Sequence, residues 1–527
     1  MMAAEKRTLL GYPLYELLDG FVAADCVIDT QYEVMGLSLD SRTIEEGFLF
    51  IACHGMQQHG LAFAEKAIER GAVAIAYEKE FTGQVDLSEY LNVLKSKNVP
   101  LIEIDELAVK IGYIADRFYG KPSRTLKITG ITGTNGKTSC SHYLASVLSQ
   151  TATVAVIGTL GNGLYNALEP ATHTTPDAIT THHLLADMRD RDASEVVMEV
   201  SSHGLAQGRV NGVRFDTAIF TNLSRDHLDY HNDMASYGQS KKKLMTMPGL
   251  RYAVVNADDE FGREILETLP DTVQSVAYSL SDAMNADAAV LRSSLMHLGC
   301  VQGSDLKFTG KGLSMHVSSP WGDTVIKSAL YGHFNAENLL AVISAALLSG
   351  MRLDDVATEI EKLSSVAGRM EYVVGAVNQA TVIVDYAHTP DALQQALEAV
   401  RSHSEKKIWC VFGCGGDRDT GKRPLMGKIA DEYADEIVLT NDNPRSESAD
   451  EIIQQIRVAI TRKKHLYIEQ DRAAAITYAL THAKRGDVVV IAGKGHEDYQ
   501  LIGDKRRAFS DADTARKALE GLANEPM

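Results

Sequence analysis

Short apolar runs alternate with longer amphipathic segments along most of the chain, which is the pattern of strands separated by helices. In the middle of the chain the strand-like runs are LKITGIT, VAVIGT, EVVMEV, DTAIFTN and YAVVNA. Residues 275–330 are richer in Ser, Gly and alternating apolar positions, and we expect a β-rich insertion there. Residues 335–350, NAENLLAVISAALLSG, have the period of about 3.6 residues that is typical of a core helix.

The pattern starts again after residue 366. The runs TVIVDYA, KIWCVFG, EIVLTND and DVVVIAG are separated by helix-length segments, which predicts a doubly wound α/β domain. Ligands of such domains bind at the carboxyl ends of the strands. His388, Arg418, Arg445 and Glu497 each follow one of the four runs, so we expect all four at that edge.

Length and pattern together predict three domains. The chain has 527 residues, which is more than one hydrophobic core normally serves. The first part alternates short strands and helices and ends at the linker-like stretch KPSR. We therefore place the domains at residues 1–120, 121–366 and 367–527.

The bulk composition narrows the class of function. A net charge of −18 argues against a nucleic-acid-binding protein, which normally presents a basic face. No apolar run reaches the roughly 18 residues of a membrane helix, and the N-terminal stretch lacks the apolar core of a signal peptide. Cys410 and Cys414 share one apolar run, which favours buried free thiols over a metal pair. We expect a cytoplasmic monomer without membrane insertion.

The stretch GITGTNGKTS, Gly130 to Ser139, lies between a predicted strand and a predicted helix. Glycines let backbone amides turn toward phosphates, Lys137 can reach the outer phosphates, and Thr138 offers a hydroxyl to Mg²⁺. The strict pattern GxxxxGK[ST] fails, because Ile131 stands in place of its first glycine. A structural turn is the alternative, but we favour an ATP loop formed by Gly133, Thr134, Asn135, Gly136, Lys137, Thr138 and Ser139.

The segment TGTNGKT resembles the ATP loop of the Mur ligase superfamily, which also includes folylpolyglutamate synthetases. Other stretches resemble the same family in order along nearly the whole chain: LDSR, HTTPD, MEVSSHGL, TNLSRDHLDYH, GRME, VDYAHTPDAL, VFGCGGDRDTGKRPLMG, DNPR and AGKGHEDYQ. Within the family they are most similar to the branch that adds meso-diaminopimelate. An ordered set of this kind is far more specific than a single loop.

The resemblance implies a three-domain α/β architecture with a central P-loop-like ATPase domain and a C-terminal Rossmann-like domain. It implies an ATP- and Mg²⁺-dependent ligase that adds meso-diaminopimelate to UDP-MurNAc-L-Ala-D-Glu through an acyl phosphate, in peptidoglycan synthesis. Chemistry of this type needs cations and fixed donors around crowded anions.

Glu199 ends the apolar run EVVMEV, where a carboxylate is costly unless it is paired or binds a metal. The resemblance makes Thr138, Glu199, His227 and Lys241 the metal-site residues, and it gives Lys137, His227 and Lys241 catalytic roles. It also implies that Lys241 carries a carbamate (N6-carboxylysine), an anion that can hold a second Mg²⁺. Lys241 is the first residue of the run KKK, so side-chain chemistry alone does not select it.

The resemblance assigns the UDP-linked substrate to the first domain and to several turns of the second. Turn and cap chemistry is the alternative for the Thr174–Thr175 and Ser201–Ser202 pairs. His173 departs from the Asn that the family often has before the threonine pair. The expected contacts are Leu39, Ser41, Met56, Gln57, Gln58, Thr174, Thr175, Ser201, Gln207 and Arg209.

The glycine-rich stretch GCGG is not a dinucleotide fingerprint, because Arg418 stands at the place of the third glycine. The resemblance instead implies contacts with the incoming amino acid from Arg418, Asp442, Asn443, Pro444, Arg445, Gly493 and Glu497. A distal carboxylate suits the fork of Arg445, and a distal ammonium suits Glu497. The stretch SESAD after DNPR departs from the commoner pattern, in which an acidic residue precedes Pro.

Four alternatives stay open. An L-lysine-adding ligase would leave Arg445 without a partner carboxylate, at a cost of about 2–5 kcal/mol. A folylpolyglutamate synthetase shares the loop but gives no reason for LDSR and HTTPD. A non-catalytic nucleotide-binding regulator would have lost Lys137, Glu199 or Lys241. A mechanical NTPase is disfavoured by the incomplete P-loop pattern and by the separate charged site of the last domain.

Overall fold

The computed structural model describes residues 11–55, 58–78, 87–281, 297–309, 312–373 and 380–524. Its contacts divide the chain into two compact units. Unit 1 consists of Met1–Ile128, Thr172–Glu195 and His203–Phe215, and unit 2 consists of Thr129–Ala171, Val196–Ser202 and Asp216–Met527. Two segments from the middle of the sequence therefore fold with the N-terminal part.

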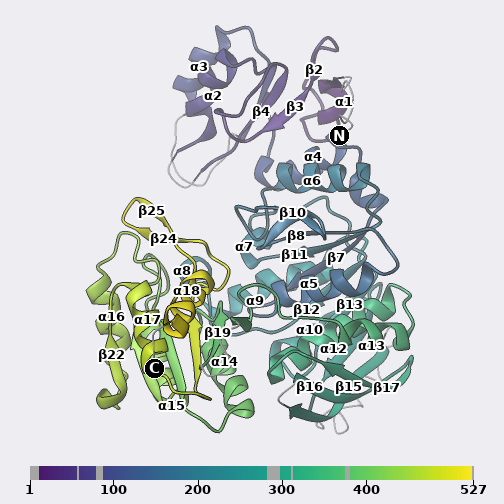
Figure 1. Ribbon diagram of the computed structural model, residues 1–527. Coiled ribbons are helices and arrows are strands. Elements are labelled where there is room, and N and C mark those ends of the chain that lie inside the picture. Colours follow the sequence, from purple (N-terminus) through teal and green to yellow (C-terminus); the bar gives the residue numbers. More distant parts are fainter. Residues whose placement is uncertain are drawn as a thin grey trace. The chain divides into compact units, whose positions relative to one another are not determined.

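Unit 1 contains a four-stranded parallel sheet (Figure 1). Its strands, in sheet order, are β3 (Gly36–Ser38), β4 (Phe48–Ala52), β5 (Ala74–Tyr77) and β6 (Leu101–Glu103). The helices are α1 (Leu14–Leu18), α2 (Ala64–Glu69), α3 (Ser88–Lys95), α4 (Leu107–Phe118) and α6 (Ala178–Asp190). Ile111 of α4 and Ile179 of α6 share one apolar core, which joins the later segment to the sheet.

The first half of unit 2 is built on an eleven-stranded sheet. The order is β10 (Ala167–Glu169), β9 (Gly161–Leu164), β8 (Val154–Gly158), β11 (Glu195–Glu199), β7 (Lys127–Thr132), β12 (Thr217–Phe220), β13 (Tyr252–Asn256), β14 (Gln274–Ser279), β15 (His297–Thr309), β16 (Gly312–Ser319) and β17 (Gly322–Ser328). The step from β14 to β15 is parallel, and β15, β16 and β17 form an antiparallel meander. The predicted β-rich insertion is thus confirmed in its described part.

Two helices cover one face of this sheet. They are α5 (Lys137–Leu148) and α12 (His333–Leu348), and both contribute to one large apolar core with residues from β7, β8 and β11 to β17. The helix α13 (Leu353–Glu361) joins the same core. α12 is buried over almost its whole length, as predicted from its apolar composition.

The C-terminal half of unit 2 has a six-stranded sheet. The order is β18 (Glu371–Val373), β19 (Thr381–Asp385), β23 (Val488–Ala492), β20 (Ile408–Phe412), β21 (Glu436–Leu439) and β22 (Leu466–Ile468). All neighbours are parallel except β18 and β19. The four strands predicted after residue 366 are β19, β20, β21 and β23.

Helices cover both faces of this sheet, which explains why its strands read as continuous apolar runs. On one face Ile383 of β19 packs in a core with α14 (Pro390–His403), α15 (Lys422–Tyr433) and α16 (Ala449–Arg457). On the other face the next residue, Val384, packs in a core with α17 (Arg472–His482) and α18 (Asp511–Asn524). A separate hairpin, β24 (Tyr499–Ile502) and β25 (Lys505–Ala508), follows β23.

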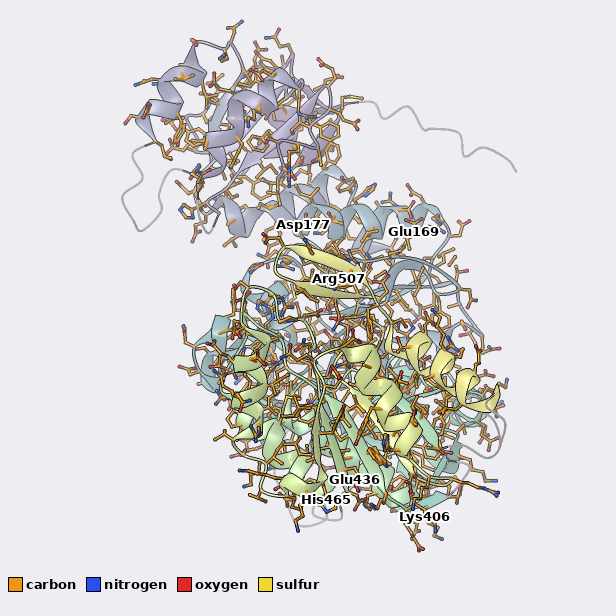
Figure 2. The ribbon with its side chains drawn as sticks, turned by 60° about the vertical axis from the view of Figure 1, so that its left-hand side comes forward. Glu169, Asp177, Lys406, Glu436, His465 and Arg507 are labelled. Atoms are coloured by element: carbon orange, nitrogen blue, oxygen red, sulfur yellow. The ribbon has the colours of Figure 1, made fainter. Side chains whose placement is uncertain are left out.

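The amino ends of these strands carry an exposed charged cluster. Glu436 at the start of β21 accepts a 2.7 Å bond from Lys407 and lies 3.2 Å from Nδ1 of His465 (Figure 2). The predicted ligand crevice belongs to the opposite edge, where the loops after the strands meet.

Two further observations concern the whole described part. None of its helices is both long enough and apolar enough to cross a bilayer. Cys410 and Cys414 are buried free thiols, as predicted, and burial raises the pKa of each to about 12.

Candidate active site

The phosphate loop joins β7 to α5 through two glycines in conformations that other residues rarely adopt. Gly133 has φ 150° and Gly136 has φ 86°. A Cβ added at Gly133 would stand 1.8 Å from Oγ1 of Thr221, and one at Gly136 would stand 2.5 Å from Oδ1 of Asn338. Glycine is therefore favoured at both positions, and the loop leads into the N-terminus of α5, where helix amides suit phosphates.

Two lysines, the half-buried Lys137 and the buried Lys241, converge on one carbonyl oxygen of this loop. Nζ of Lys137 donates to the carbonyl of Gly133 at 2.8 Å, and Nζ of Lys241 donates to the same oxygen at 2.7 Å. Burial lowers the pKa of Lys137, and it lowers the pKa of Lys241 well below the usual value, helped by the charge of Lys137. Two ammonium groups this close favour an anionic ligand beside them.

The structure separates the three lysines of the KKK run, which the sequence could not. Lys241 is 1% exposed and lies over the ring of Tyr237, with Nζ 4.3 Å from the ring centroid. Lys242 forms a 2.9 Å ion pair with Glu264, and Lys243 is exposed. Only Lys241 therefore lies in the buried cluster with Lys137.

Glu199 at the end of β11 is fully buried and aimed at the phosphate loop. Its Oε2 accepts hydrogen bonds from the hydroxyls of Thr138 at 2.8 Å and Thr159 at 3.0 Å. Its Oε1 accepts from the backbone amide of Thr159 at 2.9 Å. The structure thus brings together Thr138 and Glu199, two of the predicted metal-site residues.

These two oxygen donors suit Mg²⁺, which proteins usually bind through one or two carboxylates together with substrate phosphates and water. In the part of the chain that the structure describes, no three His, Cys, Asp or Glu side chains gather as a metal site. The donor set of Thr138 and Glu199 fits a metal ion whose remaining ligands come from the nucleotide.

His227, the third predicted metal residue, belongs to a neighbouring cluster around Asp226. Nε2 of His227 lies 3.4 Å from Oδ2 of Asp226, and Nε2 of His388 lies 3.6 Å from the same oxygen. Burial opposes the ionisation of Asp226, but the hydrogen bond and charge of His388 and the charges of His227 and Lys422 outweigh it. The pKa of Asp226 therefore lies well below its usual value.

Side chains of the C-terminal half reach the phosphate loop, which the sequence analysis missed. Arg369 donates from Nη2 to Oγ1 of Thr138 at 3.2 Å, and its guanidinium lies 4.3 Å from the ring centroid of Tyr386. Asn135 of the loop donates to Oδ2 of Asp391 at 2.8 Å. The only signal for Arg369 was its place in GRME, a stretch quoted for its family resemblance and given no role.

In unit 1, a cavity of about 270 Å³ gathers three of the residues predicted to meet the UDP-linked substrate. Leu39, Gln207 and Arg209 line it, together with His173. Arg209 donates twice to Oε1 of Gln207 and once, at 2.7 Å, to the carbonyl of Thr175.

The other predicted contacts of that substrate are not among the residues that line the cavity. Ser41 is buried and Gln58 is exposed. Thr174 belongs to unit 1 and Ser201 to unit 2. Met56 and Gln57 lie outside the described residues.

The carboxyl ends of β20, β21 and β23 bring the predicted amino-acid residues together. Asn443 donates from Nδ2 to Oε2 of Glu497 at 2.9 Å. Gly493 has φ 116°, and a Cβ there would stand 2.5 Å from Oδ2 of Asp442. The edge of this sheet therefore carries the cluster that the strand pattern predicted.

Lys494 is a second residue that the sequence analysis missed. Its side chain is fully buried, and Nζ donates to Oε2 of Glu497 at 2.8 Å and to Oδ1 of Asn443 at 3.1 Å. The carboxylate of Glu497 therefore already has a cationic partner. The stretch AGKGHEDYQ contained this lysine, but nothing in the pattern distinguished it from a surface residue.

Arg445 occupies an unusual backbone conformation, with φ 52°. The β24–β25 hairpin holds it, because its amide donates to Leu501 at 3.1 Å and its carbonyl accepts from Gly503 at 2.8 Å. Its Nη1 donates to the carbonyl of Gly416 at 2.7 Å, and Nη1 of Arg418 donates to the carbonyl of Asp417 at 3.1 Å. Neither arginine forms a salt bridge with a described residue. Both guanidinium groups thus suit a carboxylate ligand.

Three family models match this chain in order. The Mur ligase family catalytic domain matches residues 33–119, the Mur ligase middle domain matches residues 131–346, and the Mur ligase glutamate ligase domain matches residues 368–495. Together they support the predicted three-domain α/β architecture. The exact domain boundaries stay a prediction.

Curated relatives are similar over nearly the full length. A Coxiella burnetii protein named UDP-N-acetylmuramoyl-L-alanyl-D-glutamate–2,6-diaminopimelate ligase is 43% identical over 511 residues, covering 97% of this chain and 100% of the relative. An Alkalilimnicola ehrlichii protein of the same name is 45% identical over 487 residues, covering 92% of this chain and 95% of the relative.

Solved structures agree in fold. A ligase structure that carries the same name has a TM-score of 0.66 at 34% identity, covering 98% of this chain and 100% of that chain. A MurF ligase from Thermotoga maritima in complex with ADP has a TM-score of 0.59 at 16% identity, covering 92% and 98%. The second likeness concerns the fold alone.

Proposed function

Because the chain belongs to the Mur ligase family, we propose that it is an ATP-dependent amide ligase that adds meso-2,6-diaminopimelate to UDP-MurNAc-L-Ala-D-Glu in peptidoglycan synthesis. The observation that carries the reaction type is the cluster around Gly133, where two lysines donate to one carbonyl and a buried carboxylate accepts a hydrogen bond from Thr138. Such a cluster suits the transfer of a phosphoryl group between anions.

In this proposal ATP lies on the phosphate loop, from Gly133 to Ser139. The amides at the start of α5 and the ammonium of Lys137 bind its phosphates. Thr138 and Glu199 hold Mg²⁺, and His227 completes the site. When bound, Mg²⁺ supplies charge neutralisation between the phosphates and the attacking carboxylate.

The reaction then proceeds in two steps. The substrate carboxylate attacks the terminal phosphate of ATP, so that an acyl phosphate forms and ADP leaves. The free amine of the acceptor attacks the acyl carbon, phosphate leaves, and the amine nitrogen loses a proton. Lys137 stabilises the developing negative charge, and Arg369, which reaches Thr138, places a further guanidinium beside it.

We further propose that Lys241 carries a carbamate. Its ammonium first loses a proton, and the neutral amine then attacks CO₂ and loses a second proton, so that a cation is replaced by an anion. Burial beside Lys137 supports this, because the modification replaces a repulsion between two ammonium groups by an attraction. In this proposal the carbamate adds an anionic group to the metal site of Thr138 and Glu199.

The cavity lined by Leu39, Gln207 and Arg209 supports the assignment of the UDP-linked substrate to unit 1. Ser41, Met56, Gln57, Gln58, Thr174, Thr175 and Ser201 complete the proposed substrate contacts. Arg209 adds a cation to a chain of net charge −18, which suits a substrate with a diphosphate.

The acceptor lies at the carboxyl edge of the C-terminal sheet. Arg445 binds its distal carboxylate with help from Arg418, and the Glu497 region receives its distal ammonium. Lys494 already neutralises Glu497. An acceptor whose distal end carries one ammonium and one carboxylate therefore adds no net charge to this part of the site. L-Lysine lacks the distal carboxylate, and the ligase that adds it is the alternative.

The proposed enzyme meets ATP and a UDP-linked sugar, so we assign it to the cytoplasm, and we expect a monomer, which sedimentation would test. We also keep the domain boundaries at residues 120 and 366, which limited proteolysis would test.

The test is ATP-dependent phosphate release with UDP-MurNAc-L-Ala-D-Glu and either meso-diaminopimelate, L-lysine or no amino acid. We expect release only with meso-diaminopimelate. Equal release with L-lysine would keep the ligase but remove the role of Arg445. The absence of release with any acceptor would overturn the proposed reaction.

A further inference from the structure

Glu447 lies two residues after Arg445 and forms a forked ion pair with a buried arginine. Its Oε2 accepts from Nη1 of Arg423 at 2.8 Å, and its Oε1 accepts from Nη2 at 2.9 Å. The side chain of Arg423 is fully buried. Arg423 and its neighbours hold the pKa of Glu447 below its usual value. A paired, two-bond geometry of this kind fixes both distance and orientation.

The same pair connects the two loops that carry the acceptor arginines. Arg423 belongs to α15 and also donates from Nη2 to the carbonyl of Gly415 at 3.1 Å, in the loop after β20. The Oε1 of Glu447 accepts from the amide of Asp417 in that loop. Glu447 itself belongs to the loop after β21, so the pair joins both loops to a helix of the core.

Further hydrogen bonds connect the loops directly. The amide of Gly416 donates to the carbonyl of Asn443 at 2.9 Å. The hydroxyl of Ser446 donates to Asp417 at 2.7 Å. The two loops are also closely packed, since a Cβ at Gly416 would stand 1.9 Å from the carbonyl oxygen of Pro444. Direct contacts therefore couple the two loops.

We propose that Glu447 and Arg423 are positioning residues that set the separation of the guanidinium groups of Arg418 and Arg445, and so determine which acceptor the site selects. The inference rests on the proposed function, in which these arginines bind the acceptor. Arg418 follows Asp417, whose amide donates to Glu447, and Arg445 lies within the Pro444–Glu447 turn, two residues before Glu447. A shift of either loop changes the distance between the two forks.

Glu447 is followed by Ser448, the N-cap of α16, whose side chain accepts from the amide of Glu451. The turn that carries the ion pair is therefore also joined to the start of α16.

The test compares Glu447→Gln with the matched control Glu451→Gln. Glu451 is an exposed residue of the first turn of α16, and among the described residues no side-chain hydrogen bond or ion pair joins it to Arg423 or to the β20 loop. Gln keeps the size of Glu447 but offers only one acceptor atom, so the forked pair is lost. We expect the KM for meso-diaminopimelate to rise about tenfold or more, with kcat and the KM for ATP within about threefold.

A double variant separates positioning from folding. If Glu447 acts through the arginines, Glu447→Gln should add little to the KM effect in an Arg445→Ala background. A purely structural role predicts the opposite result: kcat falls for every acceptor, KM is unchanged, and the two effects add. That outcome would overturn the proposal.

A measurement without substrate keeps the inference separate from the proposed function. Hydrogen–deuterium exchange of free Glu447→Gln should speed up in residues 413–419 as well as in residues 440–448, while Glu451→Gln matches the wild type. Faster exchange confined to residues 440–448 would overturn the coupling of the loops. The wild type could release no phosphate with any acceptor although the exchange experiment shows that the loops are coupled. That result would overturn the proposed function and the role in acceptor selection, and the coupling of the loops would stand.

Discussion

Unit 2 contains two cationic centres, and they differ in which side chain carries the charge. At Gly133, Lys137 and Lys241 donate to one carbonyl, and removal from water lowers the pKa of each. At the carboxyl edge of the C-terminal sheet, Arg418 and Arg445 carry guanidinium groups, which stay protonated at any pH the enzyme meets. The charge of the first centre can change with its chemical state, whereas that of the second cannot.

The two centres also differ in how the backbone supports them. Lys137 begins a long buried helix directly after a central strand. Arg445 lies in a loop, in a left-handed conformation, and depends on hydrogen bonds from a hairpin and a second loop. The comparison indicates that the phosphate centre depends mainly on the charge of its lysines. The acceptor centre depends mainly on the distance between its two arginines.

The largest effect is expected from Lys137→Ala. Phosphate release should fall by about 10³-fold or more, because the terminal phosphate loses its nearest cation. In protein without the carbamate on Lys241, stability should not fall, because one of two neighbouring ammonium groups that repel each other is removed. Thermal unfolding measured beside phosphate release checks both statements. A variant that keeps more than a tenth of the activity would show that the terminal phosphate does not depend on Lys137.

Lys241→Ala should reduce activity by about 10²–10³-fold, since the proposed carbamate ligand is lost. With ¹³C-labelled bicarbonate, the wild type should show a carbamate resonance that this variant lacks. Lys242→Ala and Lys243→Ala are the matched controls and should keep both signal and activity. A resonance that persists in Lys241→Ala would assign the modification to another residue.

Arg445→Lys tests the second centre, because it keeps the positive charge and removes the forked donor group of the guanidinium. We expect kcat/KM for meso-diaminopimelate to fall about 10–100-fold, while the KM for ATP is unchanged. The ratio of rates with L-lysine and meso-diaminopimelate measures the loss of selectivity. If the variant behaves as wild type, charge alone governs acceptor binding and geometry is irrelevant.

The smallest effect is expected from Ser448→Ala at the N-cap of α16. The loss of a cap costs about 1 kcal/mol of stability, which denaturant unfolding would detect. The KM for the acceptor should change less than threefold, since Glu447 and Arg423 still hold the loop. A KM effect as large as that of Arg445→Lys would show that the cap, and not the ion pair, positions the arginine.

The strands of the C-terminal sheet were predictable because burial on two faces makes them continuous apolar runs. The antiparallel part of the larger sheet was predictable from its alternating apolar positions. The phosphate loop was predictable because its glycines, lysine and threonine are adjacent in sequence. The contact of Arg369 with Thr138 was not, because it joins residues on different domains that no local pattern links. The sequence also could not show that Lys494 is buried, or that Lys241 is the buried residue among Lys241, Lys242 and Lys243. The residue type alone does not tell whether a lysine is buried.

The division of the chain into two units has a consequence for its synthesis. Unit 1 includes Met1–Ile128 but also Thr172–Glu195 and His203–Phe215, so the chain passes between the units several times. A ribosome adding roughly 5–20 residues per second leaves roughly 3–12 s between residue 128 and residue 190, where α6 ends. During that interval the N-terminal sheet exists without the complete α6, whose Ala178 and Ile179 belong to its core. A nascent chain released before α6 is made would therefore expose that apolar surface, and chaperones would be expected to bind it there.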